Sequence, residues 1–182
     1  DKYIQSNIKD NIISKEKYYS ELTFHYWYWK NLLEEEDAEW IGFCQRRRLW
    51  LQDNETIKKI NYNNISDYIL KKPVDNWQNY DSILCEPIQV SGSKKTKMIK
   101  RGWRNLLKNP KIFFNLNFET INFHFDMHHG YGNLKKAISV MDDIDKTDFL
   151  NFVNTESSFN PHIMFISKKN FIKKWFDTLF PV

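Results

Sequence analysis

The sequence predicts an α/β domain, and three observations support this class. Short apolar runs bounded by turn residues alternate with segments of helical periodicity along the 182 residues. Hydrophobic residues make up 41% of the chain and aromatic residues 16%, which excludes a disordered protein. Glycine, with five residues, is too scarce for flexible linkers or collagen-like repeats. We therefore expect residues 1–182 to form a single α/β domain with a real core.

The first predicted element is a helix over residues 14–33, for which Ser14 can serve as the N-cap. Such a helix is apolar most of the way round and should be buried, which makes Glu21 conspicuous. Glu21 either pairs with His25 or Lys17 at the rim, or is a site carboxylate that binds a hydroxylated ligand. The apolar face has the three-and-four spacing of a helix: Tyr19, Leu22, Tyr26, Trp29 and Leu33.

An apolar run over residues 40–44, WIGFC, predicts a short buried strand of a parallel or mixed sheet. It leads to Arg46, Arg47 and Arg48, which are three of the five arginines in the chain. In open α/β sheets, ligands bind outside the carboxyl ends of the strands, and a guanidinium matches the geometry of phosphate. These arginines therefore either bind a phosphate or diphosphate, or pair at the surface with the acidic turn at residues 34–39.

Periodicity predicts the remaining elements less directly. They are, in chain order, a strand over residues 80–90 ended by Pro87, a strand or aromatic-rich loop over 111–125, helices over 133–141 and 146–154, a turn and strand over 159–167, and a helix over 167–180 capped by Ser167.

Two polar clusters are candidates for chemistry. Residues 125–134, FDMHHGYGNL, combine Asp126, His128 and His129 with two glycines, which predicts a tight loop that directs polar groups at a ligand. Asp126 or a histidine could act as a general base. The alternatives are a metal site, for which no third ligand is evident, and a helix-capping loop with exposed histidines.

The second cluster consists of Asn160 and His162, which flank Pro161 in a turn or in a ligand contact. An Asp-x-Asp sequence at residues 141–145, MDDID, lies between two predicted helices. It is interpreted as an acidic connection between them rather than as a metal motif.

The net charge of +4 suits nucleic acid, an anionic membrane or a phosphorylated small molecule. Basic residues concentrate in Lys94–Arg104, which is either a solvated loop or a contact with a membrane surface or phosphate. Cys44 and Cys85 lie in apolar runs and are expected to be buried free thiols in a reducing compartment. The sequence shows no transmembrane run or signal peptide, and the absence of an initiator Met suggests an excised piece of a longer protein.

Three blocks near the N-terminus resemble a family of bacterial glycosyltransferase-like proteins from capsular and O-antigen polysaccharide clusters, long known as a domain of unknown function. The family pattern runs Tyr-Cys-Glu-Leu-Thr, Tyr-Trp-x-Trp-Lys-Asn and Ile-Gly-x-Cys-His-Tyr-Arg-Arg. This chain has Ser20 in place of the first Cys, and Gln45 and Arg46 in place of His-Tyr. The later HGYGNL and FNPHIMFI segments resemble further blocks of the family, and most of its opening strand is expected to be missing. The matching positions of the first three blocks are Tyr19, Glu21, Leu22, Thr23, Tyr26, Trp27, Trp29, Lys30, Asn31, Ile41, Gly42, Cys44, Arg47 and Arg48.

The resemblance implies a GT-A-like, Rossmann-related mixed sheet flanked by helices. It also implies a cytoplasmic enzyme that transfers a hexosyl group, for example galactofuranosyl, from a nucleotide-sugar donor to a growing glycan or lipid-linked glycan. The need for Mg or Mn is left open, and no metal ligand is assigned. The site residues expected are Arg46, Arg47 and Arg48 for the donor phosphates, Glu21, Asp126 and His129 for catalysis, and Trp27, Trp29, His128, Asn160 and His162 for sugar or acceptor contacts.

Two other classes of protein remain possible on the sequence. One is a non-catalytic module that binds a nucleotide or a glycan and derives from such an enzyme. The other is a nucleic-acid-binding protein, against which the modest net charge and the acidic turn beside the arginines argue. Membrane contact, if present, is expected to be peripheral and to use Lys94–Arg104.

Overall fold

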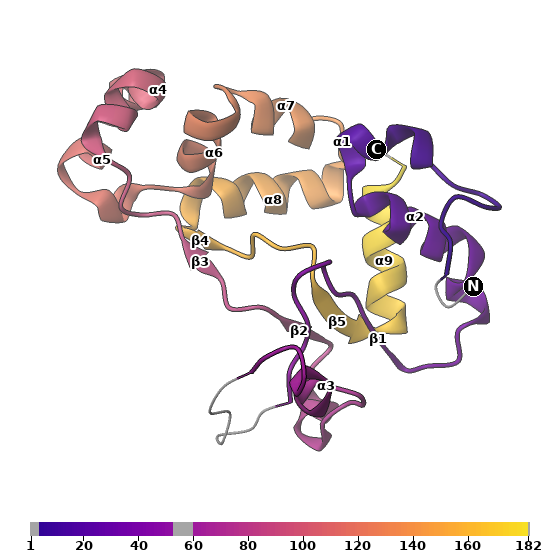
Figure 1. Ribbon diagram of the computed structural model, residues 1–182. Helices are drawn as coiled ribbons and strands as arrows, with labels where there is room; N and C mark the ends of the chain where they lie inside the picture. Colours follow the sequence, from indigo (N-terminus) through magenta and orange to yellow (C-terminus); the bar gives the residue numbers. More distant parts are fainter. Residues whose placement is uncertain (1–3, 53–59, 182) are drawn as a thin grey trace. The chain divides into compact units, whose positions relative to one another are not determined.

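The computed structural model describes residues 4–52 and 60–181 and confirms the α/β class (Figure 1). The chain divides into two compact units. Unit 1 comprises residues 1–85 and 162–181, and unit 2 comprises residues 86–161. Each unit is described by itself, and the expectation of a single domain stays a prediction.

Unit 1 contains a three-stranded sheet and helices from both ends of the chain. The strands are β1 (Trp40–Gly42), β2 (Ser82–Leu84) and β5 (Phe165–Lys168). The α-helices are α1 (Glu16–Tyr19), α2 (Leu22–Asn31), α3 (Ile65–Tyr68) and α9 (Lys169–Leu179), and the 3-10 helices are η1 (Ile13–Lys15), η2 (Leu33–Glu35) and η3 (Asp75–Asn79).

The sheet of unit 1 has the order β1-β5-β2, and β5 pairs with both neighbours in antiparallel fashion. Ile41 lies opposite Ser167, and Ile83 lies opposite Ile166. The parallel or mixed sheet inferred from the apolar run WIGFC is not what these three strands form, since both of their pairings are antiparallel. A buried strand is apolar whichever way its neighbour runs, so composition alone does not give direction.

Alternation along the segment after β1 places its two faces in different surroundings. Ile41 and Phe43 are buried in the core of unit 1, whereas Gly42 and Cys44 are exposed. The core also contains Trp27 and Tyr28 of α2 and Ile172 and Phe176 of α9. Cys44 was expected to be buried, and its exposure follows from this alternation.

The helix predicted over residues 14–33 is interrupted. Ser20 has a φ of 48° and is the C-cap of α1, where its N–H donates to the carbonyl of Glu16. Helix α2 starts two residues later. Ser14 makes no capping contact, since it lies inside η1. Glu21 consequently stands at the N-terminal end of α2 rather than in mid-helix. The pattern of apolar residues continues across the break, which is why periodicity did not reveal it.

Unit 2 is mostly helical. Its helices are α4 (Lys95–Lys108), α5 (Lys111–Phe114), η4 (Leu116–Phe118), α6 (Ile121–His129), α7 (Asn133–Ile138) and α8 (Asp143–Thr155). The strands β3 (Ile88–Gln89) and β4 (Ser158–Phe159) form an antiparallel pair.

Three expectations for the later elements are corrected. Residues 111–125 contain α5, η4 and the start of α6 rather than a strand or an aromatic-rich loop, and the Thr120 hydroxyl caps α6 by accepting a hydrogen bond from the Phe123 N–H. Lys95–Arg104 belongs to α4, with Lys94 as its N-cap, rather than to a solvated loop. Ser167 lies within β5, where its hydroxyl is bonded to Ser82 and Asp81, and α9 begins two residues later.

The packing of α4 on α6 requires a glycine. A Cβ at Gly102 would lie 2.9 Å from two ring atoms of Phe123 and 3.2 Å from Met127 Cγ. Both neighbours are about 2% exposed and belong to the same cluster as Met98 and Ile112, so neither can move aside easily.

We expect Gly102→Ala to destabilise the fold. Overpacking a dense core costs about 1–3 kcal/mol, which exceeds the ~1 kcal/mol that Ala gains over Gly in a helix. Urea unfolding followed by circular dichroism should show a lower midpoint. Thr96→Ala, at an exposed position of the same helix, is the control and should not lower it. A Gly102→Ala protein as stable as the wild type would contradict the close packing.

Acid should lower the stability of unit 1 through His25. This residue is 2% exposed, and its ring centroid lies 4.3 Å from that of Phe43. Burial lowers the pKa of His25 from 6.5 to about 4, so the unfolded chain takes up a proton at a higher pH than the folded chain does. The free energy of unfolding should therefore fall between pH 6.5 and 4 by about 3 kcal/mol from this residue.

The comparison for this prediction is His25→Phe, which keeps an aromatic ring but cannot titrate. Urea titrations at pH 7, 5.5 and 4.5 should give a shallower pH dependence for the variant. Equal slopes in the two proteins would show that His25 does not govern acid sensitivity.

Candidate functional site

The three neighbouring arginines lie on a tight turn after β1. The Arg48 N–H donates to the carbonyl of Gln45 at 3.0 Å, and the two residues form an isolated antiparallel bridge. Arg46 and Arg47 occupy the two central positions of this turn, and all three guanidinium side chains are exposed. We call residues 45–48 the arginine turn.

Gln45 and Arg48 connect the arginine turn to two side chains outside it, those of Glu21 and His162. Gln45 donates from Nε2 to Glu21 Oε2 at 2.9 Å and accepts at Oε1 from Arg48 Nη1 at 2.8 Å. Arg48 Nη1 also lies 3.2 Å from His162 Nδ1. Because a guanidinium has no acceptor, His162 must accept through Nδ1, which places the proton of the neutral ring on Nε2.

The local fold explains why these residues meet. The break at Ser20 brings Glu21 to the start of α2, and antiparallel pairing places the carboxyl end of β1 beside the amino end of β5. His162 lies just before β5 and therefore reaches the arginine turn. The sequence predicted that Glu21, His162 and the arginines share a site, and the structure brings these residues together. The sequence did not predict that Gln45 belongs to this site, because Gln45 was noted only as a departure from the family pattern.

Two hollows open beside the arginine turn. The smaller has a volume of about 270 Å³ and is lined by Glu21, Gln45 and the three arginines. The larger has a volume of about 850 Å³. The arginines line it together with residues that are mostly apolar: Leu49, Trp50, Leu51, Ile60, Asn61, Tyr62, Ile65, Cys85 and Met164. Cationic donors beside apolar walls suit a ligand with an anionic part and a flat or apolar part.

The arginines keep their charge available for a ligand. In the described ranges 4–52 and 60–181, every carboxylate ion pair is made by a lysine, and none involves Arg46, Arg47 or Arg48. The acidic turn has other partners there: Glu36 accepts from the Tyr28 hydroxyl, and Lys169 donates to the carbonyls of Glu34 and Glu36. Pairing of the arginines with that turn is therefore not formed between described residues.

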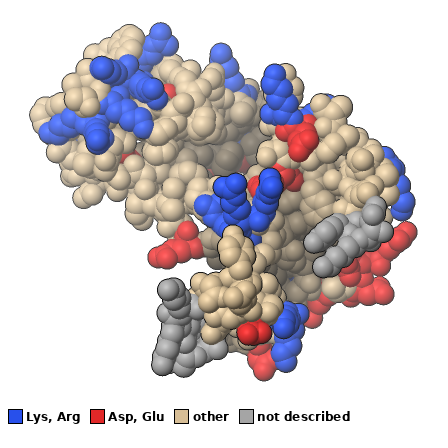
Figure 2. Space-filling view, viewed as in Figure 1, with Lys and Arg blue, Asp and Glu red and all other residues tan. Residues whose placement is uncertain are grey.

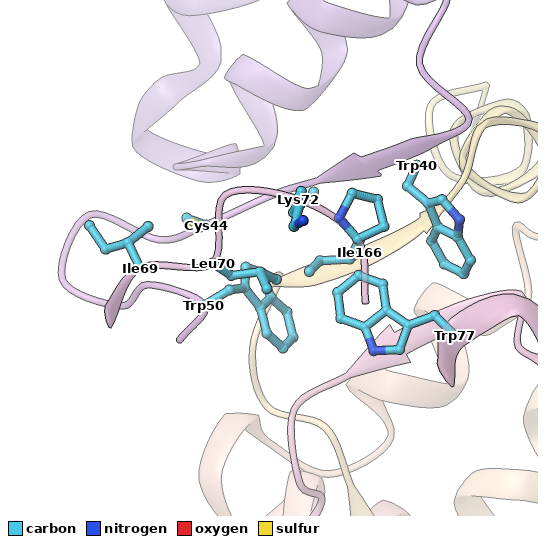
Figure 3. Close-up of a pocket in the computed structure, with 10 residues that line it drawn as sticks. Trp40, Cys44, Trp50, Ile69, Leu70, Lys72, Trp77 and Ile166 are labelled. Atoms are coloured by element: carbon cyan, nitrogen blue, oxygen red, sulfur yellow. The ribbon is translucent and has the colours of Figure 1, made fainter. Parts of the chain in front are cut away.

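A third hollow, of about 200 Å³, is lined by Gly42 and Ile166, on the face of the sheet opposite to Ile41 (Figure 3). Trp40, Trp50 and Trp77 line it, and the ring centroids of Trp40 and Trp77 are 5.6 Å apart. Trp50 also lines the large hollow, and its Nε1 donates to the carbonyl of Phe43 at 3.1 Å. Sequence patterns gave no reason to single out Trp50, because its position follows from a loop.

The two tryptophans expected to stack on a sugar pack in the core of unit 1 or against it. Trp27 is 3% exposed, and its indole N–H donates to the carbonyl of Ile8. Trp29 stacks on Phe180 with centroids 5.6 Å apart, and the Lys30 ammonium lies 3.6 Å from its ring centroid. Burial assigns Trp27 to packing, whereas Trp29 is half-buried and its contact with a sugar stays a prediction.

The histidine cluster belongs to unit 2. Asp126 is 4% exposed, and its carboxylate accepts from Asn105 Nδ2 at 2.8 Å and from the Gly132 N–H at 2.9 Å. It thereby fixes the turn after α6, in which Gly130 and Gly132 have positive φ. This geometry gives Asp126 a structural role, whatever else it does.

The histidines on the same helix are more accessible. His128 and His129 are exposed, and His128 Nε2 lies 2.7 Å from Lys97 Nζ. The pKa of His128 is lowered, first by partial burial and then by the positive charge of Lys97. Asn160 is half-buried and also lies in unit 2. The expected residues thus form two sets: the arginines, Glu21 and His162 in unit 1, and Asp126, the two histidines and Asn160 in unit 2.

The structure agrees with the interpretation of the Asp-x-Asp sequence. Residues 141–145 connect α7 to α8, and Asp143 pairs with Lys146 at 2.9 Å. Within the part of the chain that the structure describes, no three His, Cys, Asp or Glu side chains gather in a way that could hold a metal ion. Among those residues there is also no helix of the length and hydrophobicity needed to cross a membrane.

The fold is that of a glycosyltransferase-like α/β protein. A solved structure of a bifunctional glycosyltransferase, WbbM, superimposes on it with a TM-score of 0.61 at 18% identity, covering 97% of this chain. This chain spans 29% of the WbbM chain. The protein belongs to the DUF4422 family, a domain of unknown function, whose model matches residues 1–182. A search of curated proteins found no significant match.

The network fixes a tautomer that can be measured. In long-range ¹⁵N–¹H spectra, neutral His162 should carry its proton on Nε2, because Arg48 donates to Nδ1. Arg48→Ala should shift the ring toward a mixture of tautomers, whereas His129, which lies in unit 2, should be unchanged. A wild-type His162 protonated on Nδ1 would contradict the contact.

Proposed function

We propose that this protein is a glycosyltransferase that moves a hexosyl group from a nucleotide-sugar donor to a growing glycan. The observation that carries the proposal is the arginine turn, whose three exposed guanidinium groups line two hollows, the smaller of them together with Glu21. The glycosyltransferase-like fold supports it, and so does the resemblance of the sequence around these residues to the family pattern.

In this proposal the arginine turn holds the donor diphosphate. Arg46 and Arg47 stand at the tip of the turn, and guanidinium forks can bind phosphate oxygens in a bidentate manner. When the glycosidic bond to phosphate breaks, negative charge grows on the leaving nucleoside diphosphate. Fixed cationic donors stabilise that charge at little reorganisation cost. The apolar walls of the large hollow, Trp50 among them, provide room for the base or the sugar.

In this proposal Glu21 contacts the hydroxyl groups of the sugar. It lines the small hollow, and one of its carboxylate oxygens accepts from Gln45. His162 is fixed by Arg48 at the edge of the same turn. The residues proposed from unit 2 are His129 as the base and His128 and Asn160 as acceptor contacts, with Asp126 supporting the turn that follows the histidines.

The finer parts of the proposal rest on the family resemblance alone. They are a galactofuranosyl or other hexosyl donor, an acceptor in a bacterial capsule or O-antigen, and a cytoplasmic location next to the inner face of the membrane. Mg or Mn is not assigned to the arginine turn, because Glu21 is the one carboxylate among the described residues lining the small hollow, and three guanidinium groups repel a cation there.

A second candidate is a module that binds a nucleotide or glycan without catalysis. The specific observation that favours it is Gln45, which stands where the family pattern has a histidine and is engaged with Glu21 and Arg48. Such a module would bind the nucleotide through the same arginines but would not turn over a donor.

A thermal-shift panel tests the donor site. UDP, GDP, CDP, CMP and ADP are added to the whole chain, each with and without manganese. A nucleotide that binds only the folded protein raises Tm. We expect one nucleoside diphosphate to raise Tm for the wild type and Arg47→Ala to lose most of that shift, with Arg47→Lys intermediate because it keeps charge but not the fork.

The matched control is Lys174→Ala, an exposed cation on α9 that lines none of the three hollows described above. It should respond as the wild type does. If no nucleotide raises Tm, or if Arg47→Ala responds fully, the donor proposal fails. If the nucleotide binds but a donor sugar is neither hydrolysed nor transferred, the non-catalytic module is the better description.

A further inference from the structure

Residues spaced four apart form rows along helix α4 of unit 2, and three of these rows have different characters. Met98, Gly102 and Leu106 pack inward. One residue further on, Ile99, Trp103 and Leu107 are 55%, 50% and 76% exposed, and we call them the outer apolar stripe. Residues four apart lie on one helix face, so these three side chains form a continuous exposed row. Nothing within unit 2 covers this row.

The outer apolar stripe is bordered by positive charge. Lys100, Arg104 and Lys108 form the next row of the helix, and all three are exposed. Residues 87–141 contain ten lysines and arginines but only two carboxylates, Glu119 and Asp126. Both carboxylates are buried, at 0% and 4% exposed. The surface of this segment therefore presents basic charge without exposed acidic side chains.

The space-filling view agrees with this arrangement. Lys and Arg side chains gather over the part of unit 2 that contains α4, with little acidic surface among them (Figures 1 and 2). The neighbouring helix α5 adds Phe114, which is 82% exposed, and the exposed Lys111. Aromatic and aliphatic side chains thus stand beside cations on two consecutive helices.

We propose that the outer face of α4 docks onto an anionic lipid bilayer. The helix would lie in the plane of the surface, with Ile99, Trp103 and Leu107 entering the boundary between head groups and acyl chains. The adjacent lysines and arginines would face lipid phosphates. Nucleic acid fits less well, because a row of exposed Ile and Leu gains nothing from a phosphate backbone.

This surface requires neither a nucleotide nor the arginine turn. The sequence predicted only that a basic stretch, Lys94–Arg104, is either solvated or in contact with a membrane surface or phosphate. The structure adds the exposed apolar row, which extends beyond the basic stretch to Leu107, and shows that both carboxylates of residues 87–141 are buried. A protein held at a bilayer in this way would meet acceptors that are themselves carried on lipid.

The test is co-sedimentation of the full chain with vesicles at 0.15 M salt. One set contains phosphatidylcholine alone, and the other contains phosphatidylcholine with 30% phosphatidylglycerol. We expect binding to the anionic vesicles and at least tenfold weaker partitioning to the neutral ones. Ile99→Ser/Trp103→Ser/Leu107→Ser, which leaves every charge in place, should weaken anionic binding at least tenfold.

A pair of variants with equal net charge separates a defined surface from general attraction. Lys100→Glu/Arg104→Glu borders the apolar row, whereas Lys135→Glu/Lys136→Glu places the same charges on α7. The first should weaken binding at least tenfold, and the second should weaken it less than threefold. Circular dichroism and Tm of each variant confirm that it is folded.

Several results would overturn the proposal. The wild type would fail to bind anionic vesicles, the two charge variants would lose vesicle binding equally, or the serine variant would bind anionic vesicles as fully as the wild type. Self-association that the serine variant abolishes would assign the surface to a second copy of the chain. Single-stranded oligonucleotide that binds wild type and serine variant equally, and displaces vesicles, would reveal a general polyanion surface. Nucleotide-induced Tm shifts, measured separately, report on the arginine turn and are independent of these outcomes.

Discussion

The candidate site depends on the side-chain amide of Gln45. An amide is able to donate and accept at once, so it joins the Glu21 carboxylate at 2.9 Å to the Arg48 guanidinium at 2.8 Å. This link joins Glu21 and Arg48 through one amide, and no ion pair connects them among the described residues. With it, the carboxylate keeps further lone pairs for a ligand, the arginines keep their charge, and His162 is held in one tautomer.

The fold of unit 1 delivers the residues that Gln45 joins. Strand alternation from β1 onward turns Gln45 to the same face as Ile41 and Phe43. Helix α2 packs on this face, and Glu21 is its N-cap. Antiparallel pairing brings the segment before β5 to the end of β1. An aromatic core of α2, α9 and the sheet supports this arrangement, and Trp50 is tied to it through the Phe43 carbonyl.

Residue patterns were sufficient for part of this result. The apolar run WIGFC predicted β1, and three consecutive arginines after it marked the site, because both signals are local in sequence. The break at Ser20 was hidden, since apolar spacing continues through it and a positive φ at a serine leaves no trace in composition. Strand direction, the burial of Trp27 and the position of Trp50 depend on contacts between distant segments, which no local pattern encodes. In unit 2, the sequence indicated the basic charge of α4 but not its exposed apolar row, because the exposure of Ile99, Trp103 and Leu107 depends on the fold.

The central claim is that Gln45 and the arginine turn act as one unit in binding an anion. The most direct measurement is calorimetric titration of inorganic diphosphate into the wild type, Gln45→Ala, Arg48→Ala and the double variant. This account predicts that Gln45→Ala weakens binding although it removes no charge, and that the two losses do not add in the double variant, because the second residue is already displaced. Additive losses, or a Gln45→Ala protein that binds diphosphate as well as the wild type, would contradict it.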